Sequence, residues 1–453
     1  MATQTESPNA SVTVLAHGRR SFVAKKNFAG KVTVRKDVRE MQPQEIVDFR
    51  LAVAGMAAIS AQVPGDNRGF QYIAGIHGIP QFHCAHGIRA FALWHRPYVQ
   101  MFEQAMQDIV PTAYLPYWNW SEQFEIPHIF TEKTWHNPKT GKTEPNPLLA
   151  QPMHGGAPTT RKPGPTAKLQ RIGAKLAEAR MATTYDNLHP DLEGPHNGLH
   201  LWVGGDMQST DTAAYDPVFW AHHSFVEYVF CDWQDAHPGA HQPKISASDF
   251  VPFGVTVDDI WLYKDLGYVY DPYSPVPMNL GGKVENVATA ANTADAAMLP
   301  VPTLASGTTI SHFALHTLEK DFTRAEVRFE GLTPPDDSFE VRVFVNEPKA
   351  TAKTATDGNK NYLGSQHFFG HGGCFGAPGH CEPAPRDIFD LRPKHHYDPI
   401  YVRLNVTKPL RALVNSKEAG TKDAPVTLVV VDRDGKEIKD SGLHFEGFSL
   451  VLT

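Results

Sequence analysis

The chain has 453 residues, 41% of them hydrophobic and 20% charged, and a formal net charge of −7. This composition is typical of a globular protein with room for two or three domains, and the charge gives no reason to expect a nucleic-acid partner. No stretch approaches the ~20 apolar residues of a membrane span, and residues 1–30 lack the apolar segment of a signal peptide. Four cysteines are too few for a disulfide-framed secreted scaffold, so we expect a reducing, cytoplasmic setting without a membrane partner.

Residues 44–270 are predicted to be mainly helical. Apolar residues recur at intervals of three and four from Ile46 onward and again from Tyr98 to Ile109, which is the spacing of amphipathic helices that bury one face. Residues 137–171 differ, because they are rich in Pro, Gly, Lys and Thr and have almost no periodicity. They predict a long irregular loop, and long loops of this kind often cover a functional site.

The composition changes after Asp271. The chain as far as Gly307 is rich in Pro, Gly, Ala, Thr and Asn, which is typical of a linker. Beyond it, the period-two alternation of β-strands occurs in residues 339–344, 400–406, 426–431 and 448–452. Asp434-Gly435 stands where a hairpin turn is expected. The C-terminal third is therefore predicted to be an antiparallel β-sandwich.

Six histidines in two separated clusters are the main functional signal. The first cluster consists of His77, His86 and His95, and the second consists of His196, His200 and His223. Neutral imidazole suits copper, zinc, iron and nickel, and three protein ligands with an open position are typical of a reactive metal site. Two such clusters predict two metal ions side by side.

The second cluster is predicted to lie on two helices. His196 and His200 are four residues apart, so they share one face of a helix. His222 and His223 are adjacent and lie about 100° apart around a helix axis, so at most one of them points at a given metal. Glu227 lies four residues beyond His223, where a carboxylate can hold a ligating imidazole.

The helix that carries His223 has a clear start, since Asp216 is a good N-cap and Pro217 is the favoured first residue. In the first cluster, His77 ends a short helix that Gly78 would cap, and His86 lies on a loop before the helix of His95. Neither histidine cluster shows the paired Glu-x-x-His arrangement of di-iron bundles, and the chain has no cysteine tetrad. Copper is therefore the best remaining metal.

Two segments resemble the copper signatures of the type-3 copper proteins, the family of tyrosinases, catechol oxidases and molluscan haemocyanins. They read His86-x4-Phe91-x2-Trp94-His95-Arg96-x2-Val99-x3-Glu103 and Asp216-Pro-x-Phe219-Trp220-x2-His223-x3-Glu227. The resemblance implies that the six histidines hold two copper ions, bridged by O2, peroxide or hydroxide, and that His223 rather than His222 is the ligand. The chain departs from the family at Glu227, where Asp is usual, and at Ala92, where a larger apolar residue is usual.

Further segments extend the resemblance over most of the chain. Residues 34–38 and 72–80 are similar to the opening of a haemocyanin-type unit, and Tyr268-Val-Tyr270 is similar to the tyrosine motif that closes the catalytic domain. The implied organisation is α+β. It comprises an N-terminal arm (1–29), an α-helical bundle holding the dinuclear copper site (30–275), a linker (276–307) and a lid-like C-terminal β-sandwich (308–453).

The resemblance also implies roles for residues beside the ligands. Cys84 stands two residues before His86, like the cysteine that forms a thioether with that histidine in fungal and molluscan relatives, and the alternative is a small buried hydrophobe. Glu193 and Asn197 are similar to the pair that, in relatives acting on monophenols, orients a water which takes the phenolic proton. A cap or salt bridge is the alternative for Glu193. Leu201, next to His200, is expected to line the substrate mouth.

The implied activity is that of a tyrosinase, an oxidation of small phenols by O2 to o-diphenols and o-quinones. The alternatives are a catechol oxidase and a haemocyanin-like O2 carrier, both of which use the same ligands. In the family a side chain of the C-terminal domain can plug the copper pocket, but the sequence does not identify it. A chain with a single copper unit favours the enzyme over the carrier. The sequence does not decide whether the chain forms a homo-oligomer. Cys374 and Cys381 are predicted to form a disulfide loop, to remain thiols, or to handle a metal.

Overall fold

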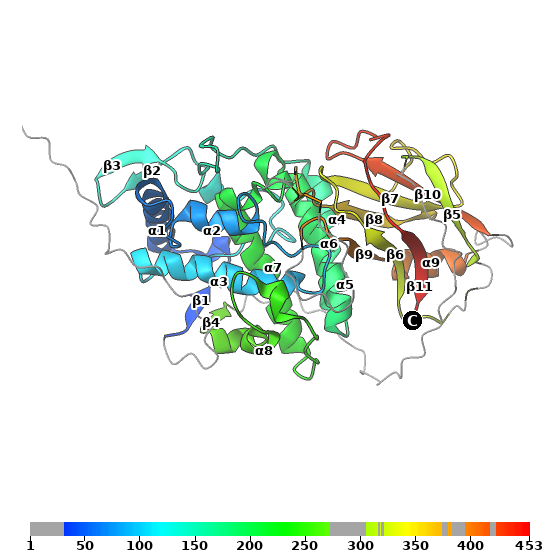
Figure 1. Cartoon of the computed structure of the whole chain (residues 1–453), viewed down its shortest axis with the longest axis horizontal. Helices are drawn as coiled ribbons and strands as arrows, with labels where there is room; N and C mark the ends of the chain where they lie inside the picture. The colour runs from blue at the N-terminus through cyan, green and yellow to red at the C-terminus, as the bar shows by residue number, and fades with distance from the viewer. Residues whose placement is uncertain are drawn as a thin grey trace, which may run out of the picture.

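The structure, a computed structural model, describes residues 31–271, 305–315, 318, 321–373, 379, 381–382, 395–416 and 423–453. The predicted N-terminal arm and nearly all of the predicted linker lie outside these residues. The described chain forms a helical part up to residue 271 and a β-rich part from residue 305. The two parts lie side by side along the long axis of the molecule (Figure 1).

The helical part is built around long helices that share one hydrophobic core. The long helices are α1 (Pro43–Gln62), α3 (Phe91–Ile109), α6 (Tyr185–Val203) and α7 (Pro217–Ala236), and the shorter ones are α2 (Phe70–His77), α4 (Thr166–Ala174), α5 (Leu176–Arg180) and α8 (Val257–Ile260). Residues on nearly every face of α6 and α7 are buried, so both helices lie inside the protein along most of their length. Asp216 caps α7 by accepting the N–H of Val218 at 2.9 Å, which confirms the predicted start.

Residues 137–171 are more regular than predicted. Strand β3 (Lys142–Pro145) pairs antiparallel with β2 (Thr134–Asn137), and α4 begins at Thr166. Most residues of these two strands are exposed or half-buried, so the hairpin carries no clear alternation of apolar residues that a sequence pattern could detect. The loop prediction is therefore correct only for the stretch between the hairpin and α4.

The ends of the helical part meet on α3. Strand β1 (Thr33–Arg35) pairs in parallel with β4 (Tyr268–Tyr270). The Arg35 side chain is fully buried, with Nη2 2.8 Å from Glu103 Oε2 and the guanidinium carbon 3.7 Å from the centre of the Tyr268 ring. A buried charge needs such partners. The segments similar to the opening and closing motifs of the family are thus joined through one arginine.

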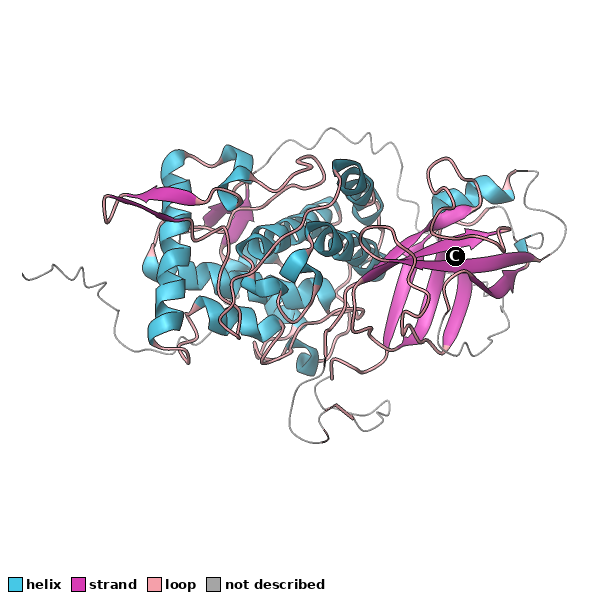
Figure 2. Cartoon of the chain, turned by 90° about the horizontal axis from the view of Figure 1, so that it is seen from above, coloured by secondary structure: helices cyan, strands magenta, loops and turns pink. Residues whose placement is uncertain are grey.

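The β-rich part consists of two antiparallel sheets that share a second hydrophobic core. The first sheet has the order β5-β10-β7-β8, formed by β5 (Thr308–Phe313), β10 (Ala424–Val431), β7 (Phe339–Val345) and β8 (Tyr362–Phe368). The second sheet has the order β11-β6-β9, formed by β11 (Gly447–Leu452), β6 (Ala325–Leu332) and β9 (Ile400–Asn405), and α9 (Thr407–Val414) follows. The strands of these two sheets gather at one end of the molecule and most of the helices at the other (Figure 2).

The four strand segments expected from alternation coincide with β7, β9, β10 and β11. Strands β5 and β8 were not expected, because polar residues interrupt their alternation. Strand β6 was missed as well, although apolar and polar residues alternate from Ala325 to Glu330. The hairpin turn at Asp434-Gly435 is present, with Gly435 at φ 81°, a left-handed conformation that favours glycine. Among the described residues, no helix has the length and apolar character that crossing a membrane requires.

The β-rich part packs on α6 through β8 and β9. Arg324, just before β6, donates two hydrogen bonds of 2.8 Å to the carboxylate of Asp191 on α6. Lys175 Nζ donates to the carbonyl of Ser365 at 2.7 Å. Because α6 also carries His196, these contacts hold the β-rich part directly over the predicted metal site.

Candidate metal centre

The six histidines predicted as ligands lie together inside the helical part. They come from α2 (His77), the loop before α3 (His86), α3 (His95), α6 (His196 and His200) and α7 (His223). None is more than 6% exposed. The ring nitrogens offered by each cluster lie within 4.8 Å of one another, and the rings of His95 and His223 stack with centroids 4.5 Å apart. The chain fold therefore places the two clusters next to each other.

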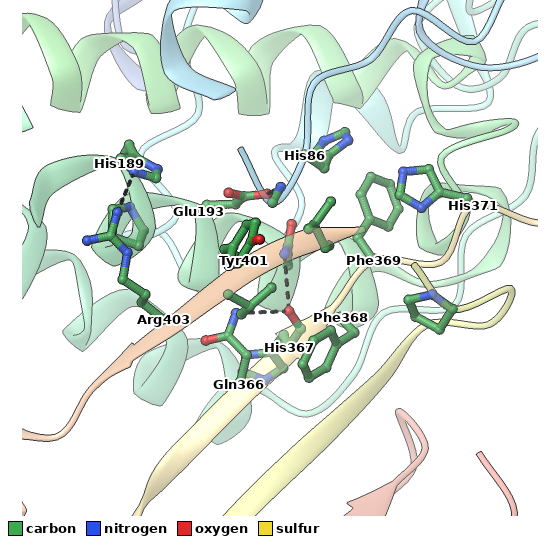
Figure 3. Close-up of a pocket in the computed structure, with 16 residues that line it drawn as sticks. His86, His189, Glu193, Gln366, His367, Phe368, Phe369, His371, Tyr401 and Arg403 are labelled. Atoms are coloured by element: carbon green, nitrogen blue, oxygen red, sulfur yellow. Dashed lines mark hydrogen bonds between the residues drawn. The ribbon is translucent and has the colours of Figure 1, made fainter. Parts of the chain in front are cut away.

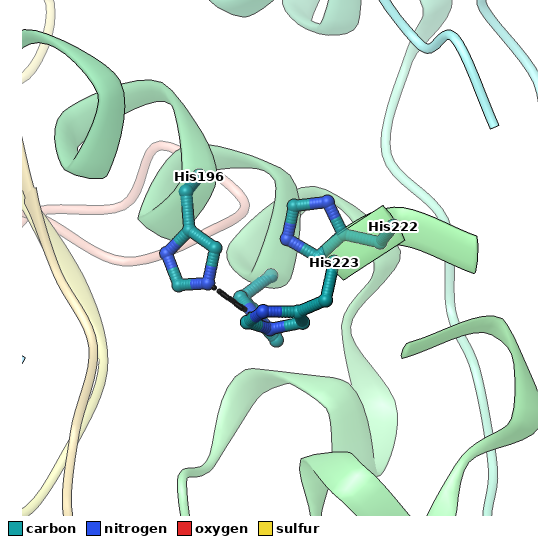
Figure 4. A group of neighbouring side chains, drawn as sticks. His196, His222 and His223 are labelled. Atoms are coloured by element: carbon teal, nitrogen blue, oxygen red, sulfur yellow. Dashed lines mark hydrogen bonds between the residues drawn. The ribbon is translucent and has the colours of Figure 1, made fainter. Parts of the chain in front are cut away.

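In the second cluster, three ring nitrogens converge. The Nε2 atom of His196 lies 3.2 Å from that of His223 and 3.2 Å from that of His200, and the latter two are 3.4 Å apart. Figure 4 shows the ring of His196 turned toward that of His223. His200 Nδ1 donates to the carbonyl of Met207 at 2.8 Å, and His196 Nδ1 donates to Asn197 Oδ1 at 2.8 Å. Both rings therefore direct unprotonated Nε2 atoms at the same point, which suits a cation.

The first cluster follows the same pattern. His77 Nδ1 donates to the carbonyl of Thr210 at 3.1 Å, and His95 Nδ1 donates to that of Phe91 at 2.8 Å. Their Nε2 atoms, and both ring nitrogens of His86, are buried without a hydrogen-bond partner among the described residues. Unpaired buried nitrogens cost free energy, and a metal ion bound by them removes that cost.

Burial keeps these imidazoles neutral, which is the form that binds metals. Loss of solvent lowers the pKa of His95 and of His200 to about 3, and it lowers the pKa of the other four well below the usual range. The residues present thus fit a pair of metal ions in donor type, in tautomer and in protonation.

His222 is held in a different way from His223. It belongs to the same group of close ring nitrogens, but its Nδ1 atom accepts the indole N–H of Trp120 at 3.0 Å. A neutral ring whose Nδ1 accepts carries its proton on Nε2, so His222 offers no lone pair to the centre. This supports the assignment of His223 as the third residue of the cluster.

The prediction that Glu227 holds a ligating imidazole is wrong. Its Oε1 atom accepts hydrogen bonds of 2.7 Å from Arg96 Nε and from the hydroxyl of Tyr268. Arg96 is fully buried, and a buried guanidinium attracts a carboxylate far more strongly than a neutral imidazole does. His223 Nδ1 has no hydrogen-bond partner among the described residues.

Glu193 and Asn197 line a pocket between the two parts of the molecule, the interdomain pocket (Figure 3). Glu193 Oε1 accepts the N–H of Gly87 at 2.6 Å, and burial raises the pKa of Glu193 to about 8. Asn197 accepts from His196 and donates through Nδ2 to the carbonyl of His367 at 3.1 Å. Both side chains thus adjoin ligand-bearing segments, and Asn197 also contacts the β-rich part.

Leu201 is fully buried and is not among the residues that line the interdomain pocket. It follows His200 on α6 and so points about 100° away from it. The mouth is lined from the β-rich part instead, by the half-buried Arg403 and by Tyr401, which is 64% exposed. No local signal marks these two residues, because they come from β9, about two hundred positions away in the sequence.

Phe369 is the residue that covers the metal centre. It follows β8, and its ring stacks on that of His200 with centroids 4.1 Å apart and lies 5.3 Å from the ring of His86. The neighbouring carbonyl of Gly370 accepts both the N–H and the hydroxyl of Thr210 at 3.0 Å. Phe369 is 4% exposed. The β-rich part therefore closes the site with an aromatic ring that the sequence did not identify.

The cysteines divide into two kinds. Cys84 and Cys231 are free thiols, and burial raises the pKa of Cys84 well above its usual value. The sulfur of Cys84 lies within 4.8 Å of a ring nitrogen of His86. Cys381 is disulfide-bonded, whereas Cys374 lies outside the described residues.

Comparison with known proteins agrees with this geometry. Residues 67–236 match the model of the common central domain of tyrosinase. Hemocyanin 1 of Megathura crenulata is 29% identical over 290 residues, and the match covers 54% of this chain and 8% of that protein. Unit G of the Helix pomatia hemocyanin beta-C chain is 31% identical over 224 residues, and the match covers 45% of this chain and 52% of that protein. The chain thus spans at most about half the length of these relatives.

Solved structures share the fold over nearly the whole chain. A functional unit of octopus hemocyanin has a TM-score of 0.60 at 20% identity and covers 93% of this chain and 100% of its own. The tyrosinase of Burkholderia thailandensis at high pH has a TM-score of 0.56 at 19% identity, covering 90% and 95%. Recombinant mushroom tyrosinase has a TM-score of 0.57 at 19% identity, covering 93% of each chain. The chain therefore contains the central domain of the tyrosinase family of type-3 copper proteins.

Proposed function

We propose that the chain is a copper-dependent phenol oxidase of the tyrosinase type, which hydroxylates monophenols to o-diphenols and oxidises o-diphenols to o-quinones. The six clustered histidines would hold two copper ions, because their convergent neutral nitrogens match the preference of copper for imidazole. Such a pair, when bound, supplies the reaction of O2 that this chemistry requires.

The observation that carries an enzymatic role is the interdomain pocket. It opens to solvent and reaches His86, and Glu193 and Asn197 line it. A carrier of O2 needs no group that takes a phenolic proton. Ionised Glu193 would accept the phenolic proton, directly or through a water shared with Asn197. Burial raises the pKa of Glu193 to about 8, so the ionised form increases as the pH rises toward that value.

The intact chain would be a closed, latent form of this enzyme. A phenol that approaches His200 meets the ring of Phe369, which already stacks there. Displacement of the segment that follows β8 would clear the ring and also release Asn197 Nδ2 from the carbonyl of His367. Opening would thus expose the centre and free a hydrogen-bond donor in one movement.

We also propose the thioether between Cys84 and His86. The support is the proximity of the free thiol to the His86 ring. Such a bond would fix the one candidate ligand that lies on a loop. Intact mass spectrometry after copper loading in air should then find a chain lighter by two hydrogens, and the Cys84→Ser variant should show no such loss.

Reversible O2 transport is the second candidate function. The cover that Phe369 forms over the histidines favours it, because a carrier must admit O2 and exclude phenols. A catechol oxidase, which lacks the hydroxylation of monophenols, would use the same site.

Oxygen uptake by the copper-loaded chain tests these functions. A monophenol and its matching catechol are supplied in parallel to the intact chain and to the Phe369→Ala variant, with His223→Ala as the blank. Uptake with both substrates supports a tyrosinase, and uptake with the catechol alone supports a catechol oxidase. Uptake with neither substrate, even in the Phe369→Ala variant, would refute the enzyme and leave O2 transport.

A further inference from the structure

A second group of candidate ligands lies beside the six histidines. The sulfur of Cys84, a ring nitrogen of His86 and a ring nitrogen of His371 all lie within 4.8 Å of one another. His371 belongs to the β-rich part and is 4% exposed, and its Nδ1 atom is buried without a hydrogen-bond partner among the described residues. A buried, unpaired nitrogen that faces a thiol and a second imidazole calls for a ligand. His86 and His371 lie on the same side of the interdomain pocket in Figure 3.

A separate pocket, the histidine pocket, leads to this group from the surface. It opens to solvent, and its lining includes His83, Cys84, His86, His371, His395 and His396. Four of the rings form a row in which the centroid distances are 4.2 Å from His395 to His396, 6.4 Å from His396 to His371 and 6.2 Å from His371 to His86. His395 and His396 are half-buried, whereas the last two are buried. The row therefore connects the surface with a member of the first histidine cluster.

The histidine pocket offers the dinuclear site an approach that avoids Phe369. Phe369 stacks on His200 and lies 5.3 Å from His86 on the side of the interdomain pocket. An ion that enters through the histidine pocket reaches His86 without displacing this ring. Both ring nitrogens of His86 are without a partner among the described residues, so His86 is able to serve both groups.

We propose that Cys84, His86 and His371 form a transfer site for Cu(I), which receives the ion through the histidine pocket and passes it to the cluster of His77 and His95. A thiolate with imidazoles is a soft donor set that suits Cu(I), and zinc is the other metal that it accommodates. On binding, the S–H bond of Cys84 breaks, a sulfur–copper bond forms and one proton leaves to solvent, with no change of oxidation state. When the ion moves on, the thiol regains a proton.

This inference rests on the proposed function, since it presumes that copper is the metal of the six histidines. It also orders two events at Cys84. A sulfur that is bonded to the His86 ring in a thioether is no longer a thiolate ligand, so copper transfer must precede that bond.

The rate of copper loading tests the transfer site. The copper-free intact chain is mixed anaerobically with chelator-buffered Cu(I), and bound copper is determined by elemental analysis at successive times. Wild type should reach two ions per chain. Cys84→Ser and His371→Ala should approach the same copper content, but at a rate that is lower by about tenfold or more, which is the usual scale for loss of one partner of a metal site. His189→Ala removes a buried histidine that lines only the interdomain pocket, and it should load at the wild-type rate.

X-ray absorption supplies a readout that is independent of rate and activity. In a His95→Ala background, where onward transfer is blocked, one equivalent of Cu(I) should show a sulfur ligand, and the added Cys84→Ser change should remove it. Unchanged loading rates and no sulfur ligand, in a chain that still binds two ions, would overturn the transfer site and leave the proposed function standing. A wild-type chain that binds no copper would overturn both.

Discussion

At the scale of single residues, charge pairing decides which carboxylates remain available for chemistry. Glu103 and Glu227 belong to the two signature motifs, yet each is bound to a buried arginine, Arg35 and Arg96 respectively. Glu193 has no such cation, and its one described hydrogen bond comes from the N–H of Gly87. Burial therefore raises the pKa of Glu193, and its carboxyl group, which lies beside the centre, is available to accept a proton.

Replacement of Glu193 by glutamine separates its two roles. The amide oxygen still accepts the N–H of Gly87, so the loop of His86 is retained, but no group takes the phenolic proton. We expect kcat for a monophenol to fall on the order of a hundredfold, while kcat for the matching catechol changes little. The wild-type monophenol rate should rise as the pH rises toward about 8, and the rate of the variant should not. An equal loss with both substrates would show that Glu193 is only structural.

Phe369→Ala and Phe368→Ala form a matched pair of variants that tests the cover over the metal centre. Phe369→Ala removes the ring that stacks on His200, so the intact chain should oxidise a catechol faster and with a lower KM. Its neighbour Phe368 also borders the interdomain pocket, but its ring packs against Phe329 and Phe339 in the β-rich core and is not among the rings stacked on the histidines. Phe368→Ala should thus lower the free energy of unfolding by about 3–5 kcal/mol without opening the site. Steady-state kinetics and thermal unfolding of both variants check this, and a higher catechol rate only in Phe368→Ala would contradict it.

At the scale of elements, α6 is the support on which both the site and its cover are built. It carries His196, His200, Glu193 and Asn197 toward the centre, while Asp191 on the same helix receives Arg324 from the β-rich part. The ion pair is bidentate and mostly shielded from water. Docking of the β-rich part is thus coupled to the helix that carries two of the three histidines of the second cluster.

Arg324→Met should weaken this docking, because it leaves Asp191 buried without its main cation. We expect a loss of about 3–5 kcal/mol in the free energy of unfolding, and the double variant Asp191→Asn, Arg324→Met should recover part of it. The exposed pair Lys162–Asp434 also joins the two parts, so Lys162→Met is the control and should cost less than about 1 kcal/mol. Denaturant unfolding measures all three, and equal losses in Arg324→Met and Lys162→Met would refute the assignment.

Asp211 makes the same interface sensitive to pH. Its carboxylate lies against Gly372 of the β-rich part, and burial together with the charge of Asp336 raises the pKa of Asp211 from 3.8 to about 7. The folded chain therefore keeps a proton there that the unfolded chain releases above pH 4, so the free energy of unfolding should decrease as the pH rises from about 4 to about 7. Solvent screening limits the change to the order of 1 kcal/mol. Asp211→Asn should flatten this part of the profile, and an unchanged slope would exclude Asp211 as its source.

At the scale of the whole molecule, the two parts differ in how closely each follows local sequence pattern. Helices α1, α3 and α7 have long apolar stripes or a strong cap, and all three agree with the prediction. Strand β8 has no comparable pattern, because its polar residues Ser365, Gln366 and His367 are buried. Its position depends in part on α6, which lies more than a hundred residues earlier in the chain.

The sequence by itself identified the six histidines as candidate metal ligands, because helix periodicity and motif spacing are local properties of the chain. Its resemblance to the type-3 copper proteins added Cys84 and Glu193 as candidates beside them. The tertiary structure alone decided that Glu227 binds Arg96, that Trp120 sets the tautomer of His222, and that Phe369 closes the site. Each of these outcomes is a competition among side chains brought together by packing, and no local pattern encodes which partner lies nearest.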